Sequence, residues 1–96
     1  MTNKELIIEL IRSTRKSEIY LDFLIDMGDT ENNEPVVCNY IKILDDPSGD
    51  RIILYDYREV DENDIPEEWF EFSELTEQQQ NLAIDAVKMT INSRSK

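Results

Sequence analysis

Residues 36–60 have the sequence VVCNYIKILDDPSGDRIILYDYREV, which contains the clearest strand and turn signals of the chain. The segments 36–44 and 51–60 are rich in valine, isoleucine and tyrosine, which favour β-strands. Between them, residues 45–50 have the turn sequence DDPSGD, in which proline sets φ and glycine accepts a positive φ. The stretch therefore predicts a β-hairpin with strands at 36–44 and 51–60.

The segment before the hairpin alternates apolar and polar residues with a period of two. One face of a strand would carry Ile19, Leu21, Phe23, Ile25 and Met27. The competing interpretation is a helix that ends at Gly28, but apolar side chains would then surround that helix on all sides, which suits only a fully buried helix. We favour a strand over residues 18–27, followed by a polar loop at 28–35.

Two helices are expected to flank the strands. Thr2 and Glu5 match a capping box, and the apolar spacing behind them predicts a helix at about 3–16. A second capping box, Thr76 with Gln79, predicts a helix from 76 to about 92. Between them, the sequence around Pro66 predicts a short helical turn at 65–70. Three aromatic residues are expected to close one end of the core: Trp69, Phe70 and Phe72.

These elements predict one acidic α+β domain over residues 1–96, in the order α-β-β-β-α. The expected architecture is a three-stranded antiparallel sheet with two helices packed on one face, around a single modest core. The element order resembles that of the double-stranded RNA-binding domain. Such domains bind phosphates with basic side chains, whereas this chain carries a net charge of −12, so the resemblance is confined to the element order.

The composition argues against most catalytic and metal chemistry. Histidine is absent, which excludes Ser-His and Cys-His nucleophile pairs and histidine-based zinc sites. Cys38 has no cation or helix N-terminus nearby in the sequence, so a structural thiol is expected rather than a nucleophile. The acid-rich loops do not match the calcium-loop motif, and two glycines cannot build a phosphate-binding loop. We therefore expect a protein that is not an enzyme, with no catalytic residue, no cofactor and no metal.

The sequence also predicts the compartment. The chain has no apolar run long enough to span a bilayer, and its N-terminal segment is amphipathic, with Glu5 and Glu9, rather than signal-like. A lone cysteine cannot form an intramolecular disulfide, whereas small secreted domains commonly contain several disulfides. We expect a cytoplasmic protein that makes no membrane contact.

Acidic residues are concentrated in the middle of the chain. The whole chain has 22 acidic and 10 basic residues, and segment 17–87 holds 20 of these acids but only three of the bases. Residues 1–16 carry four bases, and residues 88–96 carry three. Such charge repels nucleic acids and anionic lipids and attracts basic proteins. Direct binding to nucleic acid is therefore not expected.

The charge favours a non-catalytic protein-binding module. We expect an inhibitor or nucleic-acid mimic that docks in the basic groove of a nucleic-acid-processing protein. Immunity proteins of nuclease toxins and phage-type nucleic-acid mimics are similar in size and charge. The expected contact residues are Glu59, Asp61, Glu62, Asp64, Glu67, Glu68, Trp69 and Glu71. Three further aromatic residues are candidate anchors: Tyr55, Tyr57 and Phe70.

The alternative is a structural or assembly subunit, a homodimer whose acidic surface only gives solubility. An edge strand such as residues 51–57 or 19–27 would then pair across a two-fold axis. Self-association that is insensitive to salt would favour this alternative.

Overall fold

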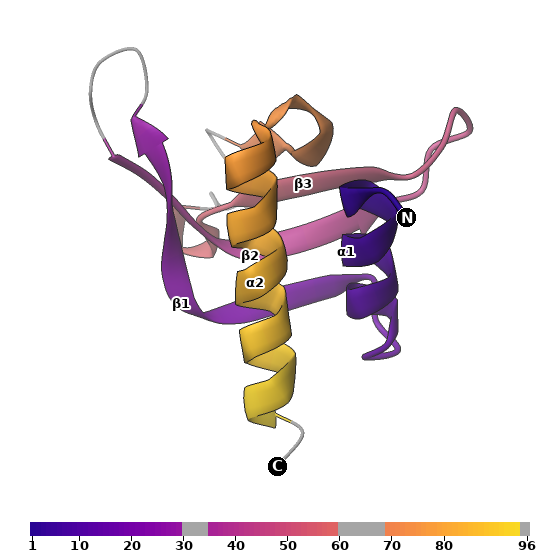
Figure 1. The fold of residues 1–96 in the computed structure, drawn as a ribbon, viewed down its shortest axis with the longest axis horizontal. Helices are drawn as coiled ribbons and strands as arrows, with labels where there is room; N and C mark the ends of the chain where they lie inside the picture. Colours follow the sequence, from indigo (N-terminus) through magenta and orange to yellow (C-terminus); the bar gives the residue numbers. More distant parts are fainter. Residues whose placement is uncertain (30–34, 60–68, 95–96) are drawn as a thin grey trace.

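The described chain has the element order α-β-β-β-β-α, with one strand more than predicted (Figure 1). The structure is a computed structural model that describes residues 1–29, 35–59 and 69–94. Helix α1 (Asn3–Arg12) precedes the strands, and helix α2 (Glu77–Arg94) follows them. The strands are β1 (Glu18–Asp29), β2 (Pro35–Leu44), β3 (Arg51–Tyr55) and β4 (Phe70–Glu71). They form one antiparallel sheet in the order β1-β2-β3-β4. The α+β class is confirmed, and the three-stranded sheet is wrong.

Strands β2 and β3 form the predicted hairpin. Their register places Tyr40 opposite Tyr55 and Ile41 opposite Leu54. In the turn, the main-chain N–H of Ser48 donates to the Asp46 carboxylate at 2.9 Å, and Gly49 has a φ of 128°. That conformation is the one for which glycine was expected in the turn.

Strand β3 ends at Tyr55, five residues before the predicted end at residue 60. The cause is Asp56, whose carboxylate accepts the main-chain N–H of Arg58 at 3.0 Å. A side chain that binds the backbone two residues ahead competes with the sheet and starts a turn. The chain therefore leaves the sheet and forms the 3₁₀ turn η1 (Tyr57–Glu59).

Residues 18–27 form a strand, as predicted, and the competing helix is wrong. Most of the predicted inward side chains are buried, but Phe23 is 40% exposed. The pairing explains this exception, because Tyr20 lies opposite Tyr40 whereas Ile25 lies opposite Cys38. Between these two pairs, β1 has four residues (21–24) and β2 has only Asn39, and such an irregularity interrupts the regular pairing.

Both predicted helix caps are present. The Thr2 hydroxyl accepts the N–H of Glu5 at 3.1 Å, and the Thr76 hydroxyl accepts that of Gln79 at 3.2 Å. Helix α1 ends at Arg12 rather than near residue 16, because Arg15 takes a φ of 67° and reverses the chain. Helix α2 continues to Arg94, two residues further than predicted.

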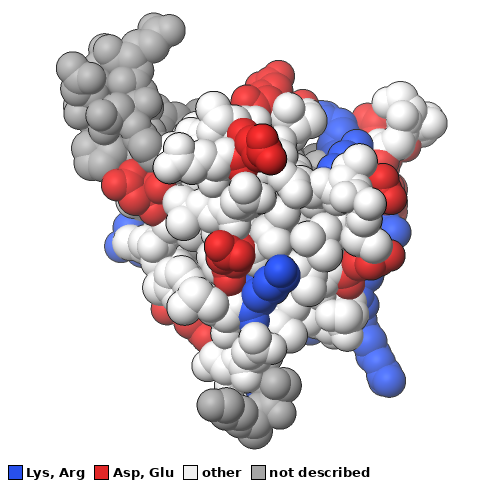
Figure 2. Space-filling view, in the orientation of Figure 1, with Lys and Arg blue, Asp and Glu red and all other residues white. Residues whose placement is uncertain are grey.

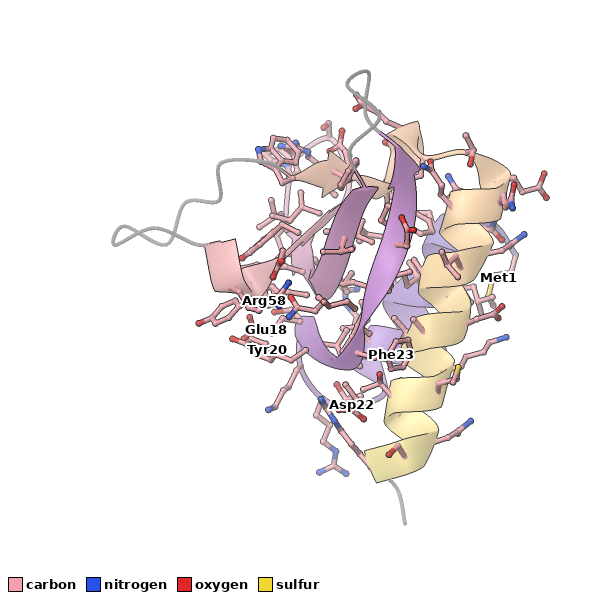
Figure 3. All side chains as sticks on the ribbon, turned by 90° about the vertical axis from the view of Figure 1, so that its left-hand side faces the viewer. Met1, Glu18, Tyr20, Asp22, Phe23 and Arg58 are labelled. Atoms are coloured by element: carbon pink, nitrogen blue, oxygen red, sulfur yellow. The ribbon has the colours of Figure 1, made fainter. Side chains whose placement is uncertain are left out.

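Both helices cover the same face of the sheet, where they enclose one hydrophobic core (Figures 1 and 3). Phe72, in the 3₁₀ turn η2 (Phe72–Glu74), is fully buried there, and Phe70 is partly buried. Trp69 is 48% exposed, so its predicted place in the core is wrong. Phe70 belongs to β4 rather than to a helical turn, and residues 65–68 of that predicted turn lie outside the described residues.

Side chains of α2 bind the main chain of β1. The Thr90 hydroxyl accepts the N–H of Asp22 at 3.4 Å, Arg94 donates to the carbonyl of Tyr20, and Gln79 donates to that of Met27 at 2.6 Å. Residues 51–57, the other edge proposed for pairing, include β3, which is internal because β4 pairs with it. Of the two edges suggested for pairing, β1 is thus partly covered by side chains of α2 and β3 by strand β4.

We expect Phe72→Ala to lower the free energy of unfolding by about 3–5 kcal/mol, because it empties a fully buried site. Phe23→Ala is the matched control, and it should cost about 1 kcal/mol or less because Phe23 is partly exposed. Urea denaturation followed by circular dichroism measures both values. Equal losses for the two variants would contradict this assignment of the core.

Candidate interaction face

The four tyrosines of the chain form one cluster on the face of the sheet that the helices leave uncovered. The ring centre of Tyr40 lies 4.6 Å from that of Tyr20, 5.0 Å from that of Tyr55 and 5.4 Å from that of Tyr57. Tyr20 and Tyr57 contact each other edge to face at 5.0 Å. These separations lie in the range in which aromatic rings attract one another. The cluster joins β1, β2, β3 and η1.

Hydrogen bonds hold this cluster in place. The Tyr40 hydroxyl donates to the Glu18 carboxylate, and the N–H of Tyr57 donates to the Asn39 side chain at 2.7 Å. The pKa of Tyr20 is raised, first by its side-chain hydrogen bond with Tyr57 and then by burial. Tyr20 therefore stays neutral at physiological pH, as its ordinary pKa already implies.

The cluster has a buried layer and an exposed layer. Tyr40 and Tyr55 are buried, whereas Tyr20 is 43% and Tyr57 is 44% exposed. Both exposed rings thus pack against the buried ring of Tyr40. Such rings can bind apolar side chains or the cationic side chains of lysine and arginine.

An ion pair fixes the turn that carries Tyr57. The guanidinium of Arg58 lies 2.9 Å from the buried carboxylate of Asp56. Hydrogen bonding by Arg58 lowers the pKa of Asp56, although burial opposes the shift. Figure 3 shows Arg58 beside Glu18 and Tyr20, on the side of the sheet away from α2.

Two predicted contact residues, Trp69 and Glu71, meet at Arg51. The Arg51 guanidinium lies 5.8 Å from the centre of the Trp69 ring and forms an ion pair with Glu71. Hydrogen bonding to Glu71 raises the pKa of Arg51. The charge of Glu71 is therefore compensated within the chain, whereas the exposed part of Trp69 faces solvent.

Of the other predicted contact residues, only Glu59 lies in the part of the chain that the structure describes. Glu59 ends η1, and Asp61, Glu62, Asp64, Glu67 and Glu68 lie outside the described residues. Among the candidate anchors, Tyr57 is exposed, Tyr55 is buried and Phe70 packs against the core. Sequence reasoning missed Tyr20 and Tyr40. The hairpin register, which follows from the turn at 45–50, could have placed Tyr40 opposite Tyr55.

The helix-bearing face has a different character. Figure 2 shows its acidic residues in separate places, with lysine, arginine and uncharged residues between them. This face therefore presents no continuous acidic surface within the described parts of the chain. A partner that recognises closely spaced carboxylates would find little there.

No family model, curated protein or solved structure matches this chain. Within residues 1–29, 35–59 and 69–94, no group of three or more cysteine, aspartate or glutamate side chains is placed to hold a metal ion. No helix in the described ranges is long and apolar enough to cross a membrane.

Cys38 is fully buried in the core and not placed for nucleophilic chemistry. Burial raises the pKa of its thiol to about 12, and the negative charge of Asp56 contributes in the same direction. The thiolate is the reactive form, so a raised pKa makes this thiol inert at neutral pH. The prediction of a structural cysteine is consistent with this environment.

We expect iodoacetamide at pH 8 to label Cys38 at least about a hundredfold more slowly in the folded protein than in urea, because the folded thiol is buried and protonated. The pKa of this thiol is higher in the folded than in the unfolded protein. Its contribution to the free energy of unfolding is therefore fully present below the ordinary pKa of 9.0 and is lost as the pH rises toward about 12. Mass spectrometry of timed samples measures the labelling. Equal labelling rates in the two states would contradict the burial of Cys38.

Proposed function

We propose that this protein is a non-catalytic binding domain that docks a basic partner protein on the helix-free face of its sheet. The observation that supports the proposal best is the pair of exposed rings, Tyr20 and Tyr57, supported by the buried rings of Tyr40 and Tyr55. Tyrosine and tryptophan are enriched among the residues that dominate binding energy, because they bury a large area at low entropic cost.

The acid-rich segment is attached to this face at both of its ends. It begins in η1, which contains Tyr57, and it leads to Trp69, which contacts Arg51. Arg51 and Tyr55 are four residues apart in β3, so their side chains leave the strand on the same face. Lysine and arginine side chains of a partner could therefore bind carboxylates and aromatic rings together. The proposed contacts are Tyr20, Tyr57 and the residues predicted from sequence: Glu59, Asp61, Glu62, Asp64, Glu67, Glu68, Trp69 and Glu71.

The partner that fits best is a cytoplasmic nucleic-acid-processing protein with a basic groove. Closely spaced carboxylates can replace phosphates in such a groove, and the net charge of −12 would accelerate the encounter. By occupying the groove, the domain would act as an inhibitor or decoy. The free, buried thiol of Cys38 fits a reducing compartment.

Two sets of variants test the proposal on the basic protein that the tagged domain captures from its native lysate. We expect Tyr20→Ser with Tyr57→Ser to weaken binding at least about tenfold, because the change removes both exposed anchors. The matched control is Met89→Ser, which alters an exposed apolar residue on α2. Surface plasmon resonance measures the affinities. The proposal fails if the control weakens binding as much as the tyrosine variant, or if no basic protein is captured.

Charge reversal gives a separate prediction. We expect Glu62→Lys with Asp64→Lys to lower the association rate about tenfold at ~0.05 M salt, and the difference should shrink at ~0.5 M salt because screening removes steering. The same reversal at Glu5 and Glu9, which lie on α1, is the control for net charge. Equal rates for the two reversed variants would contradict docking by the segment at 59–71.

Competition with duplex DNA for the captured protein then tests inhibition itself. The homodimeric assembly subunit remains the alternative. Analytical ultracentrifugation that finds self-association insensitive to salt, with no captured partner, would favour it.

A further inference from the structure

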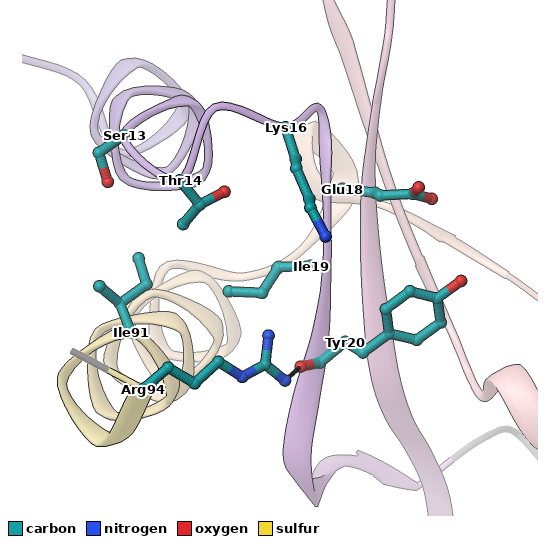
Figure 4. Close-up of a pocket in the computed structure, with 8 residues that line it drawn as sticks. All are labelled: Ser13, Thr14, Lys16, Glu18, Ile19, Tyr20, Ile91 and Arg94. Carbon is teal, nitrogen blue, oxygen red and sulfur yellow. Dashed lines mark hydrogen bonds between the residues drawn. The ribbon is translucent and has the colours of Figure 1, made fainter. Parts of the chain in front are cut away.

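A cavity of about 350 Å³ lies where the ends of both helices meet the start of β1 (Figure 4). Thr14 lines it from the turn after α1, Ile19 from β1 and Ile91 from α2. Its volume lies near the lower end of the range for small-molecule sites. Tyr20 also lines the cavity, but Figure 4 shows that its ring points away from the cavity, and this ring belongs to the tyrosine cluster.

The cavity exists because α1 stops early. The positive φ of Arg15 reverses the chain, and the main chain rejoins the sheet at Ser17, whose carbonyl accepts the N–H of Ile43 at 2.7 Å. The hydroxyls of Ser13 and Thr14 donate to carbonyls of the last turn of α1, each at 2.6 Å. Their protons are therefore already used, and a ligand would find other donors.

Those donors are the cations Lys16 and Arg94, which enter from opposite sides (Figure 4). The hydrogen bonds that Arg94 makes to described residues all use Nη2, which binds the Tyr20 carbonyl and the Asp22 carboxylate. Nε and Nη1 are thus left for a ligand. Lys16 forms no ion pair or hydrogen bond with the described residues.

Two acidic residues lie near these cations. Asp22, outside the lining, forms an ion pair with Arg94 at 3.1 Å and compensates part of its charge, whereas Glu18, the one acidic residue in the lining, points away from the cavity. Figure 4 shows the Glu18 side chain on the far side of β1, where it accepts the Tyr40 hydroxyl. Arg94 lies in the last turn of α2, where the helix macrodipole also favours a cation. Lys16 lies four residues beyond α1, so the macrodipole does not account for its position.

We infer that this cavity binds a small organic anion. A carboxylate, sulfonate or phosphate head group would lie between Lys16 and Arg94, and an apolar body would contact Ile19 and Ile91. The net charge of −12 does not prevent this binding, because the Debye length of ~8 Å at ~0.15 M salt lets the nearby cations dominate. The inference does not rest on the proposed protein partner.

The test uses anilinonaphthalene sulfonate, an anionic fluorescent probe, and phenylnaphthylamine, its neutral analogue. We expect saturable binding of the anionic probe at one site, with the neutral analogue at least about fivefold weaker because it lacks the head group. Lys16→Gln should weaken the anionic probe by a similar factor and leave the neutral analogue unchanged. The matched control, Lys88→Gln, changes an exposed lysine of α2 that does not line the cavity.

Two further measurements make the result decisive. Thermal unfolding must show that each variant is folded, because partly unfolded chains also bind this probe. In amide-resolved NMR titrations, the largest shifts are expected at Thr14, Ile19 and Ile91. The inference is overturned if the neutral analogue binds as tightly as the anion, if Lys88→Gln has the effect expected of Lys16→Gln, or if the shifts map elsewhere.

Discussion

The register between β2 and β3 determines which side chains face the helices and which face away. In an antiparallel pair, directly opposite residues point to the same face, so one register assigns a whole hairpin. Here Ile41 and Leu54 point into the core, and Tyr40 and Tyr55 point to the other face. A shift of β2 by one residue would turn Tyr40 toward the helices and Ile41 and Ile43 away from them. The core and the candidate interaction face thus have one common cause, and neither could change without the other.

The second constraint is the main chain of β1, which within the described residues has a neighbouring strand on only one side. Helix α2 supplies partners for it through Gln79, Thr90 and Arg94, and the side chain of Thr90 is fully buried. Buried polar groups of the backbone are costly unless they are hydrogen-bonded. These bonds therefore set the position of α2 along β1, beyond what apolar packing through Ala83 and Val87 would specify. The same bonds place the end of α2 beside the turn after α1, and this creates the anion cavity.

Short sequence motifs predicted correctly those elements that are fixed by hydrogen bonds between residues close in sequence. Both capping boxes and the turn at 45–50 follow from side chains that bind the backbone within three residues. The early ends of β3 and α1 have local causes at Asp56 and Arg15, whereas two other errors arose from contacts that are distant in sequence. The two residues of β4 are too few to produce a periodic pattern, and the exposure of Phe23 depends on the irregular pairing of β1 with β2. Within the candidate site, Tyr57 was predicted and Tyr40 could have been derived from the hairpin register. The position of Tyr20 could not have been derived, because that same irregularity and the segment at 28–35 separate it from the hairpin.

Tyr20 belongs to both candidate sites, to one through its ring and to the other through its main chain. Its ring belongs to the tyrosine cluster, while its carbonyl lies at the edge of the sheet and accepts a hydrogen bond from Arg94. In a strand, side chains point perpendicular to the sheet and carbonyls lie within its plane, so one residue can serve two surfaces at once. Moving the backbone of Tyr20 would shift a ring of the interaction face and the guanidinium that lines the cavity. The chain thus places a proposed site for cations and a proposed site for anions on either side of one strand.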